Sequence, residues 1–281
     1  MILLKKNNYL TFLLLFVFFN NINSFATTKD TTRQKSTAGA GVASFLIDES
    51  TILNPAPLAF FNISSVFYSN NTLSGDSITD SGDWSIIASD TTQGLKGSIS
   101  YFNSHTGTLK EKQWGFAIAK PMGKSSAIGL SYLMNKTTNL GIESKYNFAT
   151  VGIIHSLNQN FSLGIVFNDP VHNSNFTKVI SGLQYIFKDS IVIMIDFGTN
   201  FRKDMNKTFL YRSAIQVKLL SSFYLRYGIS KDDFLLNKTS GFGISWIGPK
   251  TNIDFGIRNV TDRSSLKNDY KETSFSGAIK F

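Results

Sequence analysis

The feature that most restricts the fold of this chain is a strict two-residue alternation of apolar and polar side chains. It is clearest between Thr208 and Ser230, where two alternating runs flank the short link Leu220-Ser221-Ser222. One parity holds the large apolar residues Phe209, Tyr211, Ile215, Val217, Leu219, Phe223, Leu225, Tyr227 and Ile229. Because successive side chains of a β-strand point to opposite faces, the pattern predicts a hairpin whose two faces meet different surroundings.

Two folds are compatible with such a hairpin. A soluble antiparallel sheet turns its apolar face into a core, whereas a transmembrane barrel turns it outward to lipid. Run length favours the barrel, since soluble strands most often have about 5–6 residues and a tilted membrane-spanning strand needs roughly 9–11.

The alternation recurs along the chain, although it is weaker in the first two runs. Fourteen strands are predicted after Phe60: Asn62–Asn70, Asp83–Ser89, Leu95–Phe102, Gln113–Lys120, Ser125–Met134, Tyr146–His155, Asn160–Asn168, Lys178–Phe187, Ser190–Thr199, Thr208–Leu219, Ser222–Ser230, Thr239–Ile247, Thr251–Arg258 and Glu272–Phe281. Short links such as Lys188-Asp189 alternate with longer polar links such as Asn135–Lys145 and Asn259–Lys271. Outer-membrane barrels combine short turns at one rim with long loops at the other. The predicted fold class is therefore all-β, a closed antiparallel transmembrane β-barrel of about 14 strands.

The parity opposite the apolar one holds charged and polar residues that a soluble core would accommodate poorly. They include Asp196, Arg212, Gln216, Arg226 and Arg258. A buried charge without a partner costs several kcal/mol, whereas in a barrel these groups would line a wet lumen. Arg212 and Arg226 could hold the carboxylate of an amphipathic ligand, or they could pair with Asp196 or with Asp48 and Glu49 near the N-terminus.

Both ends of the chain carry signals of export to a bacterial outer membrane. Residues 1–26 are predicted to be a cleaved signal peptide, because Lys5 and Lys6 precede the apolar run Tyr9–Phe19 and small residues flank position 25. That run is shorter than the roughly 20 residues that a membrane-spanning helix needs. The last strand ends with Phe275, Ile279 and the terminal Phe281 on its apolar face. This ending resembles the C-terminal signal by which the barrel-assembly machinery recognises outer-membrane barrels.

Residues 27–59 lack the alternation of the strands and are rich in small residues. Their pattern combines Ala38, Gly39, Ala40, Gly41, Val42 and Ala43 with Asp48, Ser50, Asn54, Pro55 and Ala56. It resembles the N-terminal signature of the FadL-like outer-membrane superfamily of long-chain fatty-acid transporters, which includes the secretion-associated PorV-like barrels. The resemblance implies a short N-terminal plug that enters the barrel from the periplasm, followed by the barrel at 60–281. Pro57 stands where the family usually has Gly. The Asn54-Pro55-Ala56 turn could be a gating hinge or a fixed turn.

Several other functions are disfavoured by the sequence. The net charge of +9 falls to +7 without Lys5 and Lys6 and is dispersed along the chain, so nucleic-acid binding is not expected. There are no cysteines and three histidines. His172-Asn173-Ser174 resembles a hydrolase pair, but no third residue that would orient the imidazole is evident. We therefore expect no catalytic residues, no metal site and no cofactor.

The predicted function is passive transport of hydrophobic or amphipathic small molecules across the bacterial outer membrane, with membrane lipid around the barrel. The alternatives are a non-transporting barrel that docks partner proteins, as PorV-like relatives do, and a general diffusion porin. The docking alternative would call for large external loops, whereas the longest links expected here have around a dozen residues.

Overall fold

The computed structural model describes residues 29–75, 81–172, 177–264 and 269–281. The expected signal peptide, residues 1–26, lies outside the described residues. Within the described ranges, no helix is long and apolar enough to span a bilayer.

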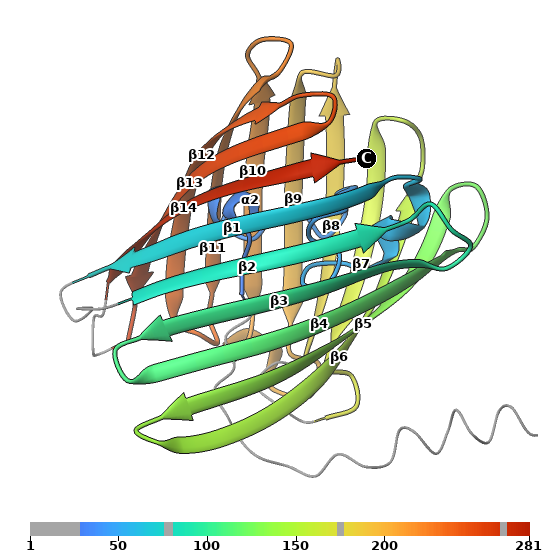
Figure 1. Cartoon of the computed structure of the whole chain (residues 1–281). Helices are drawn as coiled ribbons and strands as arrows, with labels where there is room; N and C mark the ends of the chain where they lie inside the picture. Colours follow the sequence, from blue (N-terminus) through green and yellow to red (C-terminus); the bar gives the residue numbers. More distant parts are fainter. Residues whose placement is uncertain (1–28, 76–80, 173–176, 265–268) are drawn as a thin grey trace, which may run out of the picture.

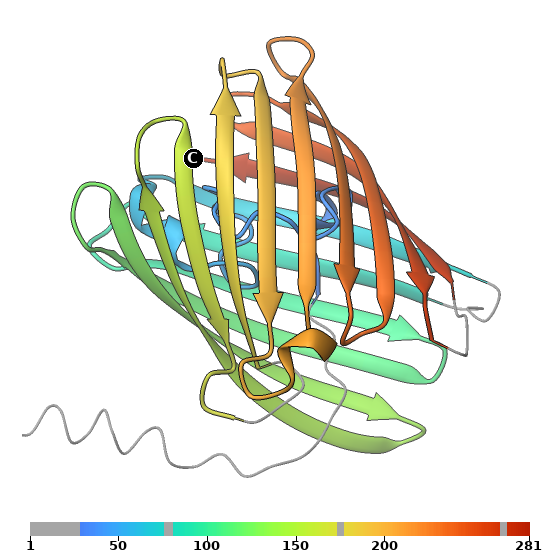
Figure 2. The same cartoon turned by 180° about the vertical axis from the view of Figure 1, so that it is seen from behind.

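Fourteen antiparallel strands close into one barrel (Figures 1 and 2). They are β1 (Ser64–Ser74), β2 (Ser81–Asp90), β3 (Lys96–Thr106), β4 (Leu109–Pro121), β5 (Ser126–Asn139), β6 (Ile142–Ser156), β7 (Phe161–Asn168), β8 (Lys178–Phe187), β9 (Ile191–Thr199), β10 (Leu210–Lys218), β11 (Phe223–Asp232), β12 (Asn237–Ile247), β13 (Thr251–Asp262) and β14 (Tyr270–Lys280). The barrel closes where β1 pairs with β14, with Phe67 opposite Ala278. Closure satisfies the backbone of every strand and leaves no open edge in hydrocarbon. The predicted fold class is confirmed.

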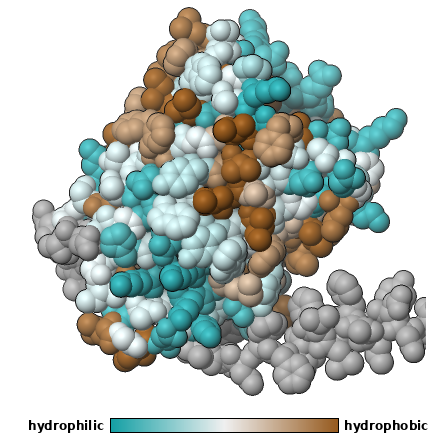
Figure 3. Space-filling model, viewed as in Figure 1, coloured by the Kyte–Doolittle hydropathy of each residue, from teal (hydrophilic) through white to brown (hydrophobic). Residues whose placement is uncertain are grey.

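The large apolar residues point away from the barrel axis. Ile193, Phe223 and Phe255 are 38%, 40% and 37% exposed, and their neighbours Asp196 and Arg226 on the other parity are buried. Figure 3 shows apolar side chains spread over the outer wall of one face, with hydrophilic side chains gathered in other regions. An exposed apolar belt on a closed barrel is the arrangement expected of a barrel surrounded by lipid.

Most strands are longer, and several links shorter, than the alternation predicted, whereas β7, β9 and β10 are one to three residues shorter. Asn135–Lys145 was expected to be a loop, yet β5 and β6 pair as far as Asn139 and Ile142, and only Leu140 and Gly141 turn between them. Likewise β13 extends to Asp262, into the expected link Asn259–Lys271. Apolar alternation marks only the part of a strand that meets lipid, whereas the backbone ladder can continue among polar residues such as Lys136 and Thr137. The predicted regular alternation of short and long links is thus wrong at the β5–β6 hairpin, where a long link was expected and two residues turn.

Residues 29–63 lie inside the barrel, and we call them the inner segment (Figures 1 and 2). It contains a short helix, α2 (Thr32–Ser36), and a 3₁₀ turn, η1 (Ala56–Phe60). A capping box formed by Thr31 and Gln34 starts α2 by satisfying two of its backbone N–H groups. The helix packs against β11–β14, and η1 packs against β3–β6. A second 3₁₀ turn, η2 (Met205–Lys207), lies in the link between β9 and β10.

Candidate functional site

The inner segment touches the wall where inward positions of the strands are glycines. A Cβ at Gly129 would lie 2.5 Å from the Pro55 carbonyl carbon, and one at Gly164 would lie 2.5 Å from the Val42 carbonyl oxygen. Gly228 and Gly241 face each other on β11 and β12. A Cβ at Gly241 would clash with the backbone of α2, and a Cβ at Gly228 would clash with the backbone of Thr37 in the turn after α2. Because real Cβ atoms do not approach so closely, these glycines allow the inner segment to fit. In sequence they were visible only as small residues on the inward parity.

The turn at residues 38–42 brings four of the predicted site residues together. Gly39 and Gly41 have φ angles of 83° and 129°, which favour glycine. The backbone N–H groups of Gly41 and Val42 donate to the Asp196 carboxylate at 2.9 and 3.3 Å. Arg212 donates to the Gly39 carbonyl at 3.0 Å. Asp196 and Arg212 lie opposite each other on β9 and β10, so this pair of strands holds the turn.

Asn54, Pro55 and Ala56 are buried and connect two parts of the inner segment. The Asn54 amide donates to the Val42 carbonyl at 2.8 Å, and its oxygen accepts from the Ala56 N–H at 3.0 Å. Pro55 is the N-cap residue that immediately precedes η1. In this structure the three residues form a braced turn, and whether it also acts as a hinge stays a prediction.

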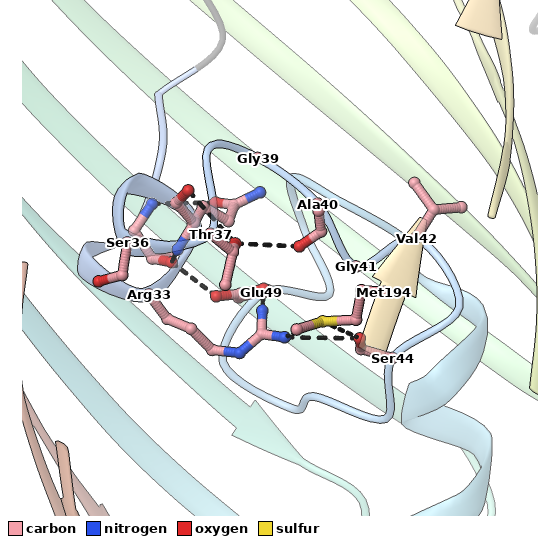
Figure 4. Close-up of polar contacts among 12 residues, drawn as sticks. Arg33, Ser36, Thr37, Gly39, Ala40, Gly41, Val42, Ser44, Glu49 and Met194 are labelled. Atoms are coloured by element: carbon pink, nitrogen blue, oxygen red, sulfur yellow. Dashed lines mark hydrogen bonds and ion pairs between the residues drawn. The ribbon is translucent and has the colours of Figure 1, made fainter. Parts of the chain in front are cut away.

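A buried ion pair lies within the inner segment (Figure 4). Arg33 Nη1 lies 2.8 Å from Glu49 Oε2, and the Thr31 hydroxyl donates to Glu49 Oε1 at 2.7 Å. The Ser44 hydroxyl donates to Gln184 Oε1 of the wall at 2.7 Å. Sequence reasoning considered Glu49 as a partner for the wall arginines and overlooked Arg33, because the contact joins residues far apart in a segment without periodicity.

Asp48 also differs from the pairing considered for it. Its carboxylate accepts a hydrogen bond from Ser65 Oγ of β1 at 3.0 Å rather than from an arginine. Burial raises the pKa of Asp48 to about 6, against the lowering effect of the Ser65 bond and of Lys280.

The remaining predicted lumen residues form two polar networks on the wall. Arg226 contacts Asp254 at 2.6 Å and Gln216 at 2.7 Å, and it also bonds Ser245. Arg258 pairs with Glu272 of β14 at 2.6 Å and with Asp30 of the inner segment. Arg226 is only 3% exposed, so the expectation of a wet lumen around these charges is wrong at this position, because the inner segment covers them.

Other predicted positions lie outside this region. Phe275 and Ile279 are 53% and 59% exposed on the outer face of β14, and Phe281, directly after this strand, is 70% exposed. His172 Nδ1 lies 2.6 Å from Asp169 Oδ1, an acidic partner that sequence reasoning did not identify, while Ser174 lies outside the described residues. The part of the chain that the structure describes holds no group of three or more His, Asp or Glu placed to bind a metal.

No family model and no curated protein matches the sequence. Solved structures do match the fold. The monoaromatic hydrocarbon channel CymD has a TM-score of 0.72 at 12% identity over 92% of this chain and 99% of its own. The toluene transporter TbuX of Ralstonia pickettii has a TM-score of 0.70 at 10% identity over 92% of this chain and 100% of its own. The toluene transporter TodX of Pseudomonas putida has a TM-score of 0.71 at 10% identity over 92% of this chain and 99% of its own. The chain therefore has the 14-strand barrel fold of hydrocarbon channels of the FadL-like outer-membrane transporters, as the resemblance of its N-terminal segment implied.

Proposed function

We propose that this protein is a passive outer-membrane channel for hydrophobic or amphipathic small molecules. In this proposal residues 1–26 direct export and are removed, residues 27–59 form the plug, residues 60–281 form the barrel, and the barrel-assembly machinery recognises the C-terminal strand. The shared fold with hydrocarbon channels supports the proposal at the level of architecture.

The observation that carries the proposal is the occupied barrel interior. A general diffusion porin keeps a water-filled channel, whereas here the inner segment packs on the wall through buried apolar clusters. One cluster joins Ile47 and Leu58 to Ala117, Ala127 and Ile154 of the wall. Another joins Val42 and Leu53 to Val166, Ile180 and Leu210. A lumen of this kind suits a gated passage for apolar molecules better than free passage of ions.

A reversible cross-link tests whether passage requires the inner segment to move. The chain has no native cysteine, so an introduced pair reacts alone. A Cβ on Gly115 would lie 3.4 Å from the Thr51 Cβ, close to the roughly 3.5–4.5 Å spacing of a disulfide. We would combine Thr51→Cys and Gly115→Cys with Ser100→Ala, because the Ser100 hydroxyl occupies the space that the new Cβ needs. The Leu133 Cδ2 methyl, 2.7 Å from that Cβ, must also shift, and it is the end of a flexible side chain.

The readout is the initial uptake of labelled toluene by cells that carry the protein, minus uptake by cells without it. We expect oxidation to abolish this difference and reduction to restore it. The matched control is Thr150→Cys with Asn168→Cys, since these wall residues face each other on β6 and β7 with side-chain oxygens 3.0 Å apart and leave the inner segment free.

Three results would contradict the proposal. Uptake that persists in the oxidised Thr51–Gly115 variant would place the passage elsewhere. Steady ion conductance in planar bilayers without a ligand would indicate a diffusion porin. Absence of both uptake and conductance would leave docking of partner proteins as the better reading.

A further inference from the structure

The polar contacts of the inner segment fall unevenly on the wall. On β7–β10 it bonds to Ser162, Gln184, Asp196 and Arg212. On the side formed by β14 and β1–β5, the hydrogen bonds and ion pairs of the inner segment lie at two levels of the wall. One level includes Asp83 and Glu111, and the other includes Ser65 and Ser89. Between these levels, within the described residues, no hydrogen bond or ion pair joins the inner segment to the wall.

The strand register defines the residues in that intermediate zone. Two neighbouring rows cross six strands, one formed by Ser276, Ser69, Ser85, Phe102, Gln113 and Asn135. The other row is formed by Ala278, Phe67, Ile87, Ser100, Gly115 and Leu133. We call these twelve residues the uncharged wall patch, because they include no acidic or basic side chain. All of them are buried.

The uncharged wall patch contains several buried polar atoms without a hydrogen-bond partner. They are Ser100 Oγ, Gln113 Oε1, Asn135 Nδ2 and Ser276 Oγ. The four side chains are between 0% and 6% exposed. Because nearly all buried polar groups in proteins are hydrogen-bonded, a group of such atoms at one place points to a missing partner. The apolar residues Phe67, Ile87 and Phe102 form a cluster directly beside them.

The inner segment itself covers the patch. Ile52 packs against the cluster of Phe67, Ile87 and Phe102. The neighbouring Thr51 lies over Gly115, and its hydroxyl also lacks a partner. Ile52 therefore covers the apolar residues of the patch, whereas the Thr51 hydroxyl makes no hydrogen bond to its polar atoms.

We propose that the uncharged wall patch is the binding site for an uncharged amphipathic molecule, one with an apolar ring or chain and a hydroxyl or amide group. The molecule takes the place that Thr51 and Ile52 occupy in this structure. This inference rests on the proposed function, and it specifies the substrate class of the passage.

The hydrogen-bonding chemistry of the patch selects the polar group. Gln113 Nε2 donates to Asn135 Oδ1 at 2.7 Å, which leaves one acceptor atom, Gln113 Oε1, and one donor atom, Asn135 Nδ2, without a partner. If the oxygen and nitrogen of both amides were exchanged, the pair would again leave one donor atom and one acceptor atom without a partner. A hydroxyl or amide satisfies both, whereas an ionised carboxylate only accepts. A carboxylate would also enter a zone without a cation of its own, because the lysines at the adjacent level, Lys35 and Lys29, are already paired with Asp83 and Glu111. A fatty-acid anion is therefore disfavoured.

The test compares toluene, benzyl alcohol and benzoate, which share one ring and differ in the polar group. Binding is measured by calorimetric titration of purified full-length protein in detergent, with each ligand also titrated into detergent alone. The variant is Gln113→Leu with Asn135→Leu. Since it removes two unsatisfied atoms, we expect it to fold and to unfold at a temperature at least as high as wild type. The control is Asn168→Leu on β7, whose amide oxygen already accepts from Thr150 at 3.0 Å.

For wild type we expect benzyl alcohol to bind about three- to tenfold more tightly than toluene, and benzoate to bind most weakly. In the double Leu variant the preference for the alcohol should disappear while toluene binding persists, and the control should keep the preference. Equal binding of toluene and benzyl alcohol, tighter binding of benzoate, or an unchanged preference in the double Leu variant would each overturn the inference. The first or last result would leave ordered water as the partner of these atoms. If no ligand binds and none is taken up by cells, the proposed function itself fails.

Discussion

The ion pair between Arg33 and Glu49 offers a quantitative test of how the inner segment is held. Both side chains are nearly buried, at 10% and 4% exposure, and their charged atoms are 2.8 Å apart. Glu49→Ala leaves the Arg33 guanidinium buried without its carboxylate, with a sulfur and a hydroxyl at 3.4 Å as its remaining partners. Removal of one partner from a buried ion pair costs about 3–5 kcal/mol.

That cost should fall on the inner segment and not on the barrel, because neither residue takes part in the strand ladder. At about 1.4 kcal/mol per factor of ten, the equilibrium for release of the segment should shift on the order of a hundredfold to several thousandfold. Hydrogen exchange of amides at positions 31–53 measures this shift directly, up to the rate of an unstructured peptide. The temperature of barrel unfolding should change little.

The matched control uses the same substitution in an exposed ion pair. Glu143 and Lys136 are 2.5 Å apart but 52% and 43% exposed, so water screens them and Glu143→Ala should leave exchange unchanged. Arg33→Met combined with Glu49→Leu should recover much of the protection, since an apolar pair can replace a buried ion pair. If Glu49→Ala has no more effect on residues 31–53 than Glu143→Ala has, the ion pair does not hold the segment.

Three further predictions concern other parts of the structure. The raised pKa of Asp48, about 6 instead of 3.8, means that the seated segment prefers the protonated acid. Acidification from pH 6 to 4 should therefore raise the protection of amides near Asp48, measured against an unstructured peptide at the same pH, by on the order of tenfold, and Asp48→Asn should abolish this rise in protection. Gly228→Val should displace the Thr37 backbone and expose the segment to protease, whereas Gly277→Val, where a Cβ meets nothing closer than 3.7 Å, should not. Deletion of Phe281 changes none of the fourteen strands but removes the last residue of the predicted assembly signal. It should therefore lower the yield of folded, heat-resistant barrel on gels.

The wall of the barrel follows from the sequence to a large extent. Alternation identified all fourteen strands and the outward or inward direction of residues such as Phe223 and Arg226, because the two faces of a strand differ at every second residue. It located strand ends less well, as at Asn139 and Ile142, because the apolar signal stops at the edge of the lipid while backbone pairing continues.

The contents of the barrel were decided by the tertiary structure. The bond of Asp196 to the Gly41 backbone joins residues 155 positions apart, and the uncharged wall patch exists only because six strands align their registers. Neither feature leaves a periodic pattern in the sequence, because each depends on residues that are far apart along the chain. Side-chain direction in a strand is a local property, whereas the partner of an inward side chain depends on how the barrel closes around the inner segment.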